Sequence, residues 1–420
     1  MTDHDPAGTA SLASGTAEAA RAQMAADLRA HSRALSEPIQ EAFATVPRHL
    51  FVPEVGPSAA YRDEAFVIKC GPDGIPVSSS SQPAMMAIML GQLELQSGHR
   101  VLEIGTGSGY NAALISVITA PRGKVVSLDI DLELVERARS SLAAAGFSEV
   151  EVRCADGGYG DPAGAPFDRV VVTAGVWDIA PAWFEQLADD GRLVMPLSVR
   201  GVELSVALRR GDSGWQSTSA CRCGFVRMLG AFAGPQTVLR LGDAEPLIGL
   251  ISDGADADVG AVHEALAGRR VTDLPTGLVV RDQSELGDLD LWLTLTEPEL
   301  SRLTVMSPVT GGQPIQPLLP LGGLLSDATD AQRLGIATLL PGTGLGHAFE
   351  VGVRGYGPSG KLLAEHLAAR ALWWHELGRP GAADLRLNVC RSGAGAEPSA
   401  GMLMLERPSA SITVGWPDRD

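Results

Sequence analysis

The sequence has few cysteines, few charged residues and a shortage of basic residues relative to acidic ones. Its five cysteines among 420 residues are too sparse and odd in number for a disulfide framework, so we expect reduced thiols and a cytoplasmic protein. Charged residues make up 20%, below the roughly 25% of typical globular chains. The 33 basic and 50 acidic residues give a net charge of -17, which argues against binding to nucleic acid or to an anionic membrane surface.

Long apolar runs and metal-ligand spacings are also missing. No segment approaches the ~18 apolar residues of a membrane span. The first residues include Asp3 and Asp5 and lack an apolar core, so we do not expect a secretory signal. Cys221 and Cys223 are separated by a single residue, which is not zinc-ligand spacing, and we predict no metal site. The sequence leaves the oligomeric state open.

The length and the 45% hydrophobic content allow two domains with real cores. Residues 1–16 are mostly Ala, Gly, Ser, Thr and Asp, which favours a disordered tail. Residues 17–44 are helix formers that Pro38 divides into two helices. The composition changes near residues 236–254, so we predict a first domain over residues 17–235, its N-terminal helices forming a lid, and a second over residues 240–420.

Apolar strand-like runs alternate with helical runs between residues 100 and 197, which predicts an α/β fold with a doubly wound parallel sheet. Residues 202–210 alternate in polarity and resemble an antiparallel addition to that sheet. For the second region we expect a smaller α/β domain with one helix over residues 360–378. Its expected strands are 291–296, 349–357, 385–390, 402–406 and 411–416.

The strongest local pattern is the turn after the strand-like run that begins at Arg100. Gly105, Gly107 and Gly109 follow one another at every second position, and glycine permits positive φ and close approach to a ligand. This spacing differs from the dinucleotide fingerprint. Glu103 would repel a pyrophosphate but suits an amino-bearing or cationic ligand, and Thr106 lies within the same turn.

Acidic residues also follow the next two predicted strands. Asp129 ends the second strand, where a carboxylate can accept hydrogen bonds from ribose hydroxyls, and Asp156 followed by Gly157 ends the third, where the carboxylate could accept from an adenine amino group. Because ligands of open α/β sheets bind at the carboxyl ends of the strands, these residues together indicate S-adenosylmethionine as the cofactor.

At this point the sequence resembles the protein-L-isoaspartate O-methyltransferases. The resemblance covers roughly residues 40–230 and rests on motifs in the same order. These are VPRHLFVPE (46–54) with AYRDEAFVI (60–68), SSSSQPAMMAIML (78–90), VLEIGTGSGYNAALI (101–115), FDRVVVTAGVWDIAP (167–181) with DDGRLVMPL (189–197), and, more loosely, CGFVRMLGAF (223–232) as a terminal strand. It implies a doubly wound methyltransferase domain.

Transfer of a methyl group to a carboxylate needs no general base, because the acceptor has a pKa near 3.9 and is ionised at pH 7. The enzyme must hold the acceptor oxygen and exclude water, which calls for hydroxyl and backbone donors. Residues 78–81 supply four serines. The resemblance implies that Ser81 is the active-site serine, with Ser80 beside it.

The resemblance leaves the substrate open between two kinds of aspartyl carboxylate. Repair members of the family methylate isoaspartyl residues in many proteins, whereas extended relatives methylate a normal aspartate of a ribosomally made peptide and install an aspartimide. The roughly 180 residues after the family-like region favour the second kind and a peptide partner recognised by residues 240–420. A general repair enzyme is the main alternative, and a cofactor-binding interaction protein without catalysis is a weaker one.

Overall fold

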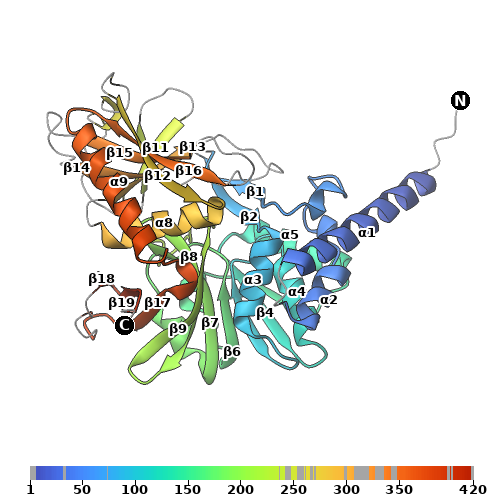
Figure 1. Ribbon diagram of the computed structural model, residues 1–420. Helices are drawn as coiled ribbons and strands as arrows, with labels where there is room; N and C mark the ends of the chain where they lie inside the picture. The colour runs from blue at the N-terminus through green and yellow to red at the C-terminus, as the bar shows by residue number, and fades with distance from the viewer. Residues whose placement is uncertain are drawn as a thin grey trace, which may run out of the picture.

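The computed structural model describes residues 6–31, 35–72, 74–235, 237–241, 247–252, 260, 262–264, 268, 271–297, 300–306, 321–326, 335–341, 348–394, 398 and 401–417. Figure 1 shows two units, a larger one built on a wide sheet and a smaller one in which α8 and α9 accompany a second sheet. Among the described residues, no helix is both long and apolar enough to cross a bilayer.

The larger unit is a ten-stranded sheet of order β18-β19-β17-β9-β8-β7-β6-β3-β4-β5. Its parallel part, β5-β4-β3-β6-β7, confirms the predicted doubly wound arrangement. The predicted antiparallel addition is β8, which pairs with β7, and β9 follows it. The first seven strands are β3 (Arg100–Ile104), β4 (Lys124–Asp129), β5 (Glu151–Cys154), β6 (Phe167–Val172), β7 (Leu187–Val199), β8 (Val202–Gly211) and β9 (Gly214–Cys223).

Two apolar cores lie on the two faces of this sheet. One face packs against α1 to α5, and the other against α6 and against α8 of the smaller unit. Burial of these faces provides the main driving force for the layered arrangement. The helices of the larger unit are α1 (Pro6–His31), α2 (Glu37–Thr45), α3 (Pro83–Leu93), α4 (Tyr110–Thr119), α5 (Leu132–Ala144) and α6 (Pro181–Glu185).

The N-terminal segment differs from the prediction. Helix α1 begins at Pro6, so residues 6–16 are helical where composition favoured a disordered tail. These residues extend the helix formed by the alanine-rich residues 17–31, and a helix that has formed propagates more easily than it nucleates. The expected division of the following segment is confirmed: α1 ends at His31, and α2 begins at Glu37 with Pro38 in its first turn.

A short hairpin precedes α3. Strand β1 (Phe66–Cys70) pairs antiparallel with β2 (Pro76–Ser80), and the two form a separate sheet. The serine-rich run 78–81 therefore lies at the end of this hairpin, directly before the first turn of α3.

The smaller unit is an antiparallel sheet of order β10-β11-β13-β14-β15-β16-β12, and it includes the predicted helix as α9. Its core lies between the sheet and the two helices. Its elements are β10 (Thr237–Leu241), β11 (Leu247–Ser252), β12 (Val271–Val280), α8 (Gln283–Thr296), β13 (Leu300–Met306), β14 (Leu321–Ser326), β15 (Gly335–Pro341), β16 (Phe349–Tyr356) and α9 (Gly360–Glu376).

The strand predicted at residues 291–296 is wrong, because these residues form the end of α8. Leu291 and Leu295 face the core of the larger unit, whereas Leu289 and Trp292 face the core of the smaller one. A helix buried on several sides has no polar face, so its 3.6-residue period is hidden in the sequence.

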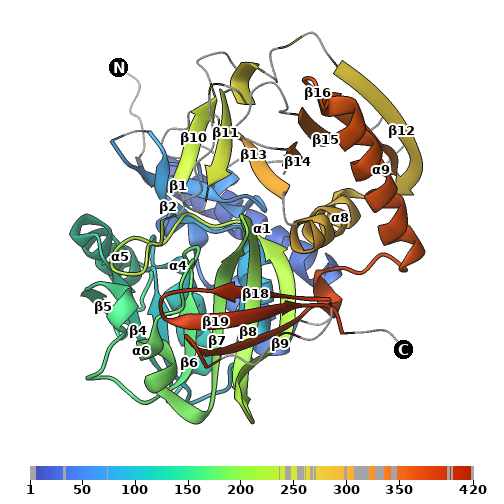
Figure 2. The ribbon, with the colours of Figure 1, turned by 90° about the vertical axis from the view of Figure 1, so that its left-hand side faces the viewer.

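The last three strands correct the predicted domain boundary. Strands β17 (Arg386–Arg391), β18 (Met402–Glu406) and β19 (Ala410–Gly415) exist as expected, but they extend the sheet of the larger unit, with β17 beside β9 (Figure 2). The predicted domain 240–420 is therefore too long. Residues from β10 to α9 (237–376) form an insertion, and the chain after α9 returns to the first sheet. The segment 223–232, expected to contain a terminal strand, forms only an isolated bridge between Gly175 and Arg227 after β9 ends.

Candidate active site

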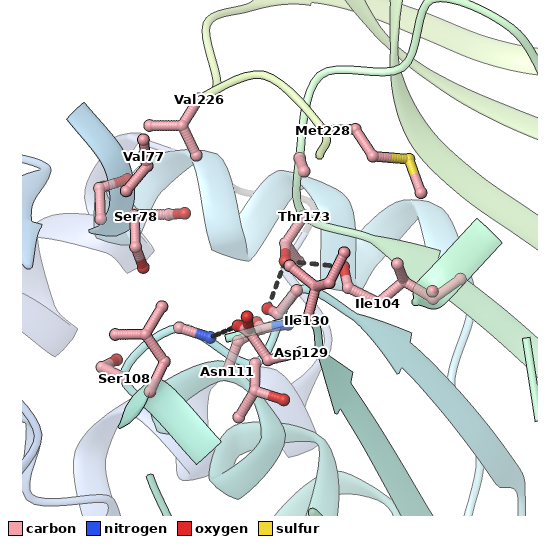
Figure 3. A pocket seen from close by; sticks show the side chains of 18 of the residues that line it. Val77, Ser78, Ile104, Ser108, Asn111, Asp129, Ile130, Thr173, Val226 and Met228 are labelled. Carbon is pink, nitrogen blue, oxygen red and sulfur yellow. Dashed lines mark hydrogen bonds between the residues drawn. The ribbon is translucent and has the colours of Figure 1, made fainter. Parts of the chain in front are cut away.

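A pocket lies at the carboxyl ends of β3, β4 and β6, where the direction of winding of the parallel sheet changes. The space between its lining residues is about 800 Å³, a volume that includes open solvent. The pocket is lined by residues of the β1–β2 hairpin (the serine hairpin), of the turn 105–109 (the glycine turn) and by residues 226–229 in the segment after β9. In Figure 3, Val77 and Ser78 come from the hairpin side, Asp129 and Ile130 from the end of β4, and Val226 from the segment after β9. This is the position at which open α/β sheets bind ligands.

The glycine turn approaches its neighbours too closely for larger residues. Gly105 has a φ of +98°, and a Cβ there would lie 2.5 Å from Thr173 Oγ1. Gly107 has a φ of +51°, and a Cβ there would lie 3.3 Å from the Ser79 carbonyl oxygen. Both glycines line the pocket, as does Thr106, so the backbone of the turn itself forms one wall.

Gly109 packs against a neighbouring helix, and its expected contact with the cofactor stays a prediction. It precedes α4 with a φ of +86°, and a Cβ there would contact Ala138 and Leu142 of α5. It is not among the residues that line the pocket. Gly109 therefore allows two helices to pack closely and does not form part of the wall.

Glu103 lies beneath the turn and not in the pocket lining. It is fully buried, and its carboxylate accepts hydrogen bonds from Asn111 Nδ2 at 2.8 Å and from Ser127 Oγ. Burial raises the pKa of this carboxyl to about 7. Asn111 itself lines the pocket, so any influence of Glu103 on a ligand passes through its neighbours or through its charge.

Asp129 is the acidic residue that the structure brings into the pocket. Its Oδ2 accepts from the Gly107 N–H at 2.9 Å, and its Oδ1 accepts from the Asp131 N–H at 3.1 Å. Each carboxylate oxygen has a second acceptor site, so Asp129 can both order the glycine turn and accept from a ligand. Burial raises its pKa.

Asp156 is not among the residues that line the pocket. Its two oxygens accept from the Gly158 N–H at 2.9 Å and from the Ala231 N–H at 2.8 Å. The carboxylate thus fastens the segment after β9, and contact with an adenine amino group remains a prediction. Gly157 does line the pocket and has no room for a side chain, because a Cβ would lie 2.3 Å from Ile104 Cγ2.

Ser80 and Ser81 both line the pocket. Ser80 is 2% exposed, and its hydroxyl has no hydrogen-bond partner within the described part of the chain. Ser81 is half-buried, and its carbonyl oxygen accepts from Arg48 Nη2 at 2.9 Å. Both serines predicted for the acceptor are thus among the residues that line the pocket, and contact of their hydroxyls with an acceptor stays a prediction.

Several pocket residues were missed from the sequence. Ile130 directly follows Asp129 and is 42% exposed, and Leu229 is 46% exposed on the segment after β9. Ile130 could have been found from its position next to the acidic strand end. Leu229, like Met228, lies more than a hundred residues after the glycine turn, in the segment 223–232 that the resemblance assigned only loosely to a terminal strand.

The doubly wound sheet, the glycine turn and the acidic strand end beside it define an S-adenosylmethionine-dependent methyltransferase. The family model described as Protein-L-isoaspartate(D-aspartate) O-methyltransferase (PCMT) matches residues 19–231. The chain belongs to this family. Its reaction class is therefore methyl esterification of aspartyl or isoaspartyl carboxylates with S-adenosylmethionine as cofactor, as the resemblance predicted.

Curated relatives agree with this assignment. Protein-L-isoaspartate O-methyltransferase 2 of Archaeoglobus fulgidus is 42% identical over 180 residues, which cover 43% of this chain and 79% of that protein. The protein-L-isoaspartate O-methyltransferase of Roseiflexus sp. is 40% identical over 196 residues, or 46% of this chain and 85% of that protein. A solved structure titled protein-L-isoaspartate O-methyltransferase has a TM-score of 0.48 and 22% identity, covering 87% of this chain and 95% of that one.

Proposed function

We propose that this protein tailors a ribosomally made peptide by methylating the side chain of a normal aspartate. General repair of isoaspartyl residues is the alternative within the same reaction class. The single observation that carries the proposal is a second unit, outside the family match, whose first strand begins eight residues after Leu229 of the pocket lining. From the cysteine content we place the protein in the cytoplasm.

The start of the second unit is fixed close to the pocket. Gly234 packs so closely on Trp177 that a Cβ would lie 2.6 Å from its side chain. Arg227, which lines the pocket, directs Nη2 toward the Ala233 carbonyl oxygen at 3.4 Å. Strand β10 begins at Thr237, three residues after Gly234, and three residues span about 10 Å at most. A peptide whose aspartate enters the pocket would thus pass close to this unit.

The second unit is also firmly docked. Arg222 of β9 forms an ion pair with Asp290 of α8 at 2.9 Å, and Arg200 Nη1 donates to the carbonyl oxygens of Thr294 and Glu297 at 2.8 and 2.9 Å. With the apolar contacts of α8, these bonds support a fixed orientation. A general repair enzyme must accept many sequences, whereas a fixed neighbouring surface suits one peptide.

The chemistry of the pocket lining suits the cofactor. Gly105 and Gly107 let the backbone approach an amino-acid group closely, and the Asp129 carboxylate can accept from two ribose hydroxyls. Ile130 and Leu229 offer exposed apolar side chains to a flat base. When bound, S-adenosylmethionine supplies a methyl group on a positively charged sulfur.

The residues of the chain hold the acceptor and exclude water. The aspartate side chain is already ionised at pH 7, so no residue has to remove a proton. We assign Ser81, with Ser80 beside it, to the acceptor oxygens as hydroxyl donors. After esterification, the backbone nitrogen of the next residue attacks the ester carbonyl carbon. The carbon–oxygen bond to the methoxy group breaks, and methanol leaves with the amide proton, giving an aspartimide.

Mass spectrometry of peptides incubated with the enzyme and S-adenosylmethionine tests the proposal. Matched peptides carry either aspartate or isoaspartate at the same position in several unrelated sequences, and a short peptide encoded beside the gene is included. Gain of a methyl group and loss of methanol on an aspartate of that one peptide supports tailoring. Methylation of isoaspartyl peptides regardless of sequence would establish repair instead.

A further inference from the structure

Arg48 is a fully buried arginine that the reaction chemistry described above does not use. It lies in the short 3₁₀ helix Arg48–Leu50 and is 0% exposed. Its Nη1 donates to the carbonyl oxygens of Ala60 and Arg62 at 2.9 and 3.0 Å, and its Nη2 donates to those of Glu64 and Ser81 at 3.0 and 2.9 Å. One guanidinium thus joins the segment before β1 to the end of the serine hairpin.

The guanidinium lies directly behind the hairpin. Its central carbon is 5.2 Å from the ring centroid of Phe66 and 5.7 Å from that of Tyr110. Phe66 is the cross-strand partner of Ser80 in the hairpin, and Tyr110 lines the pocket. Arg48 is therefore close to the pocket wall without being part of its lining.

The charge of Arg48 has no direct counter-ion among the described residues, since its hydrogen-bond acceptors are neutral carbonyl groups. The carboxylates of Asp63 and Glu64, which act on Arg48 through space, have other partners: Asp63 accepts from the Ala84 N–H at 2.8 Å, and Glu64 lies 3.3 Å from Arg62. Burial lowers the pKa of Arg48 to about 10, so the group stays charged at pH 7. A buried cation without an ion pair is costly, and a functional role would explain its presence.

We propose that Arg48 is the positioning residue of the acceptor site: it fixes the Ser81 peptide and supplies the positive charge that favours a carboxylate beside Ser81. This inference rests on the proposed role of Ser81. A carboxylate bonded to the Ser81 hydroxyl would lie within about 9 Å of the Arg48 Nη2 nitrogen. At that separation in a protein interior, one unit charge changes the binding of an anion by about tenfold.

Two substitutions separate the effect of the Arg48 charge from the effect of its four hydrogen bonds. Arg48→Met removes both the charge and the four hydrogen bonds, whereas Arg48→Lys keeps the charge but cannot bond four carbonyls in a planar fork. The matched control is Arg62→Met. Arg62 belongs to the same segment and lies 5.9 Å from the Phe66 ring, but its side chain is 54% exposed, and the substitution retains its carbonyl group.

The experiment compares two peptides on the full-length enzyme saturated with S-adenosylhomocysteine. One is the peptide methylated in the assay above, and the other carries an amide in place of its acceptor carboxylate. We expect the wild type and Arg62→Met to prefer the carboxylate peptide, Arg48→Met to reduce that preference about tenfold, and Arg48→Lys to retain most of it. We also expect Arg48→Lys to lower kcat at least tenfold at an unchanged cofactor Kd.

Each of the other outcomes refutes one part of the proposal. If Arg48→Met weakens both peptides equally, the arginine is merely structural and the charge role is wrong. If Arg48→Met does not melt cooperatively, Arg48→Lys decides, and a wild-type kcat in that variant refutes positioning. A wild type that shows no preference for the carboxylate peptide contradicts the assigned acceptor site itself, which separates failure of the proposed function from failure of this inference.

Discussion

Replacing Glu103 by glutamine is expected to flatten the pH dependence of folding stability. Burial raises the pKa of the Glu103 carboxyl from 4.5 to about 7 in the folded protein. The folded state therefore binds more protons than the unfolded chain between these values, and the unfolding free energy falls as the pH rises through this window. A shift of this size corresponds to about 3 kcal/mol, all of it lost by about pH 8.

Glutamine can replace the carboxylate with little disturbance. Its amide oxygen can accept from Asn111, and its amide nitrogen can donate to Ser127, whose hydroxyl then turns to donate to Thr106 Oγ1, 2.6 Å away. Urea unfolding at pH 5 and pH 8 measures the effect. Glu203, whose pKa burial also raises to about 7, is the companion variant, and each glutamine is expected to remove part of the slope. A Glu103→Gln profile parallel to that of the wild type would show that the carboxyl is already ionised at pH 5.

Three further predictions concern the cofactor, the hairpin and the C-terminal strands. Asp129→Ala is expected to weaken S-adenosylmethionine binding tenfold to a hundredfold by calorimetry, from the loss of about 1.5–3 kcal/mol of charge-assisted hydrogen bonding; an unchanged Kd would remove Asp129 from the site. Lys69 bridges the hairpin to Asp131 and Glu133 at 2.6 Å each, so Lys69→Met is expected to speed cofactor release several-fold at low salt. The difference in release rate should vanish near 1 M salt, where charges are screened. A difference that does not depend on salt would show that these ion pairs do not slow cofactor release. A chain ending at Gly378 lacks β17, β18 and β19. The buried side chains of Leu387 and Ile412 each contribute about 2–5 kcal/mol, so this chain is expected to lose its cooperative thermal melt. A cooperative melt would disprove the role of these strands in the core.

The parts of the fold that the sequence predicts are those set by local pattern. Strands β3 and β4 are each followed by a turn and a helix within a few residues, and the alternation of apolar strand-like and helical runs was enough to predict the parallel sheet. The glycine turn was recognisable because positive φ at Gly105 and Gly107 demands glycine. Asp129 lies at the end of β4 and in the pocket lining, because strand ends converge at one edge of a parallel sheet, and its contact with the cofactor stays a prediction.

The wrong predictions concern segments that contact both units or that return from one unit to the other. Residues 291–296 alternate in polarity like a strand, but the helix that contains them is buried between two cores, and the usual polar face is missing. The return of residues 386–415 to the first sheet depends on pairing with β9, more than 160 residues earlier. Pairing at that separation leaves no trace in local composition, so the domain boundary at residue 240 was too simple.

The acceptor side of the pocket shows a further limit of local reasoning. The segment 60–64, which precedes β1, forms no α-helix or β-strand and contains only the end of a 3₁₀ turn at Ala59–Tyr61. Such a segment has no ladder of hydrogen bonds to hold it, and its carbonyl groups must be satisfied in another way. Here the Arg48 guanidinium satisfies three of them, those of Ala60, Arg62 and Glu64, and its bond to the Ser81 carbonyl ties Ser81 to this segment. The rigidity that a methyl-transfer site needs therefore comes, on this side, from a side chain whose partners lie 12 to 33 residues away along the chain.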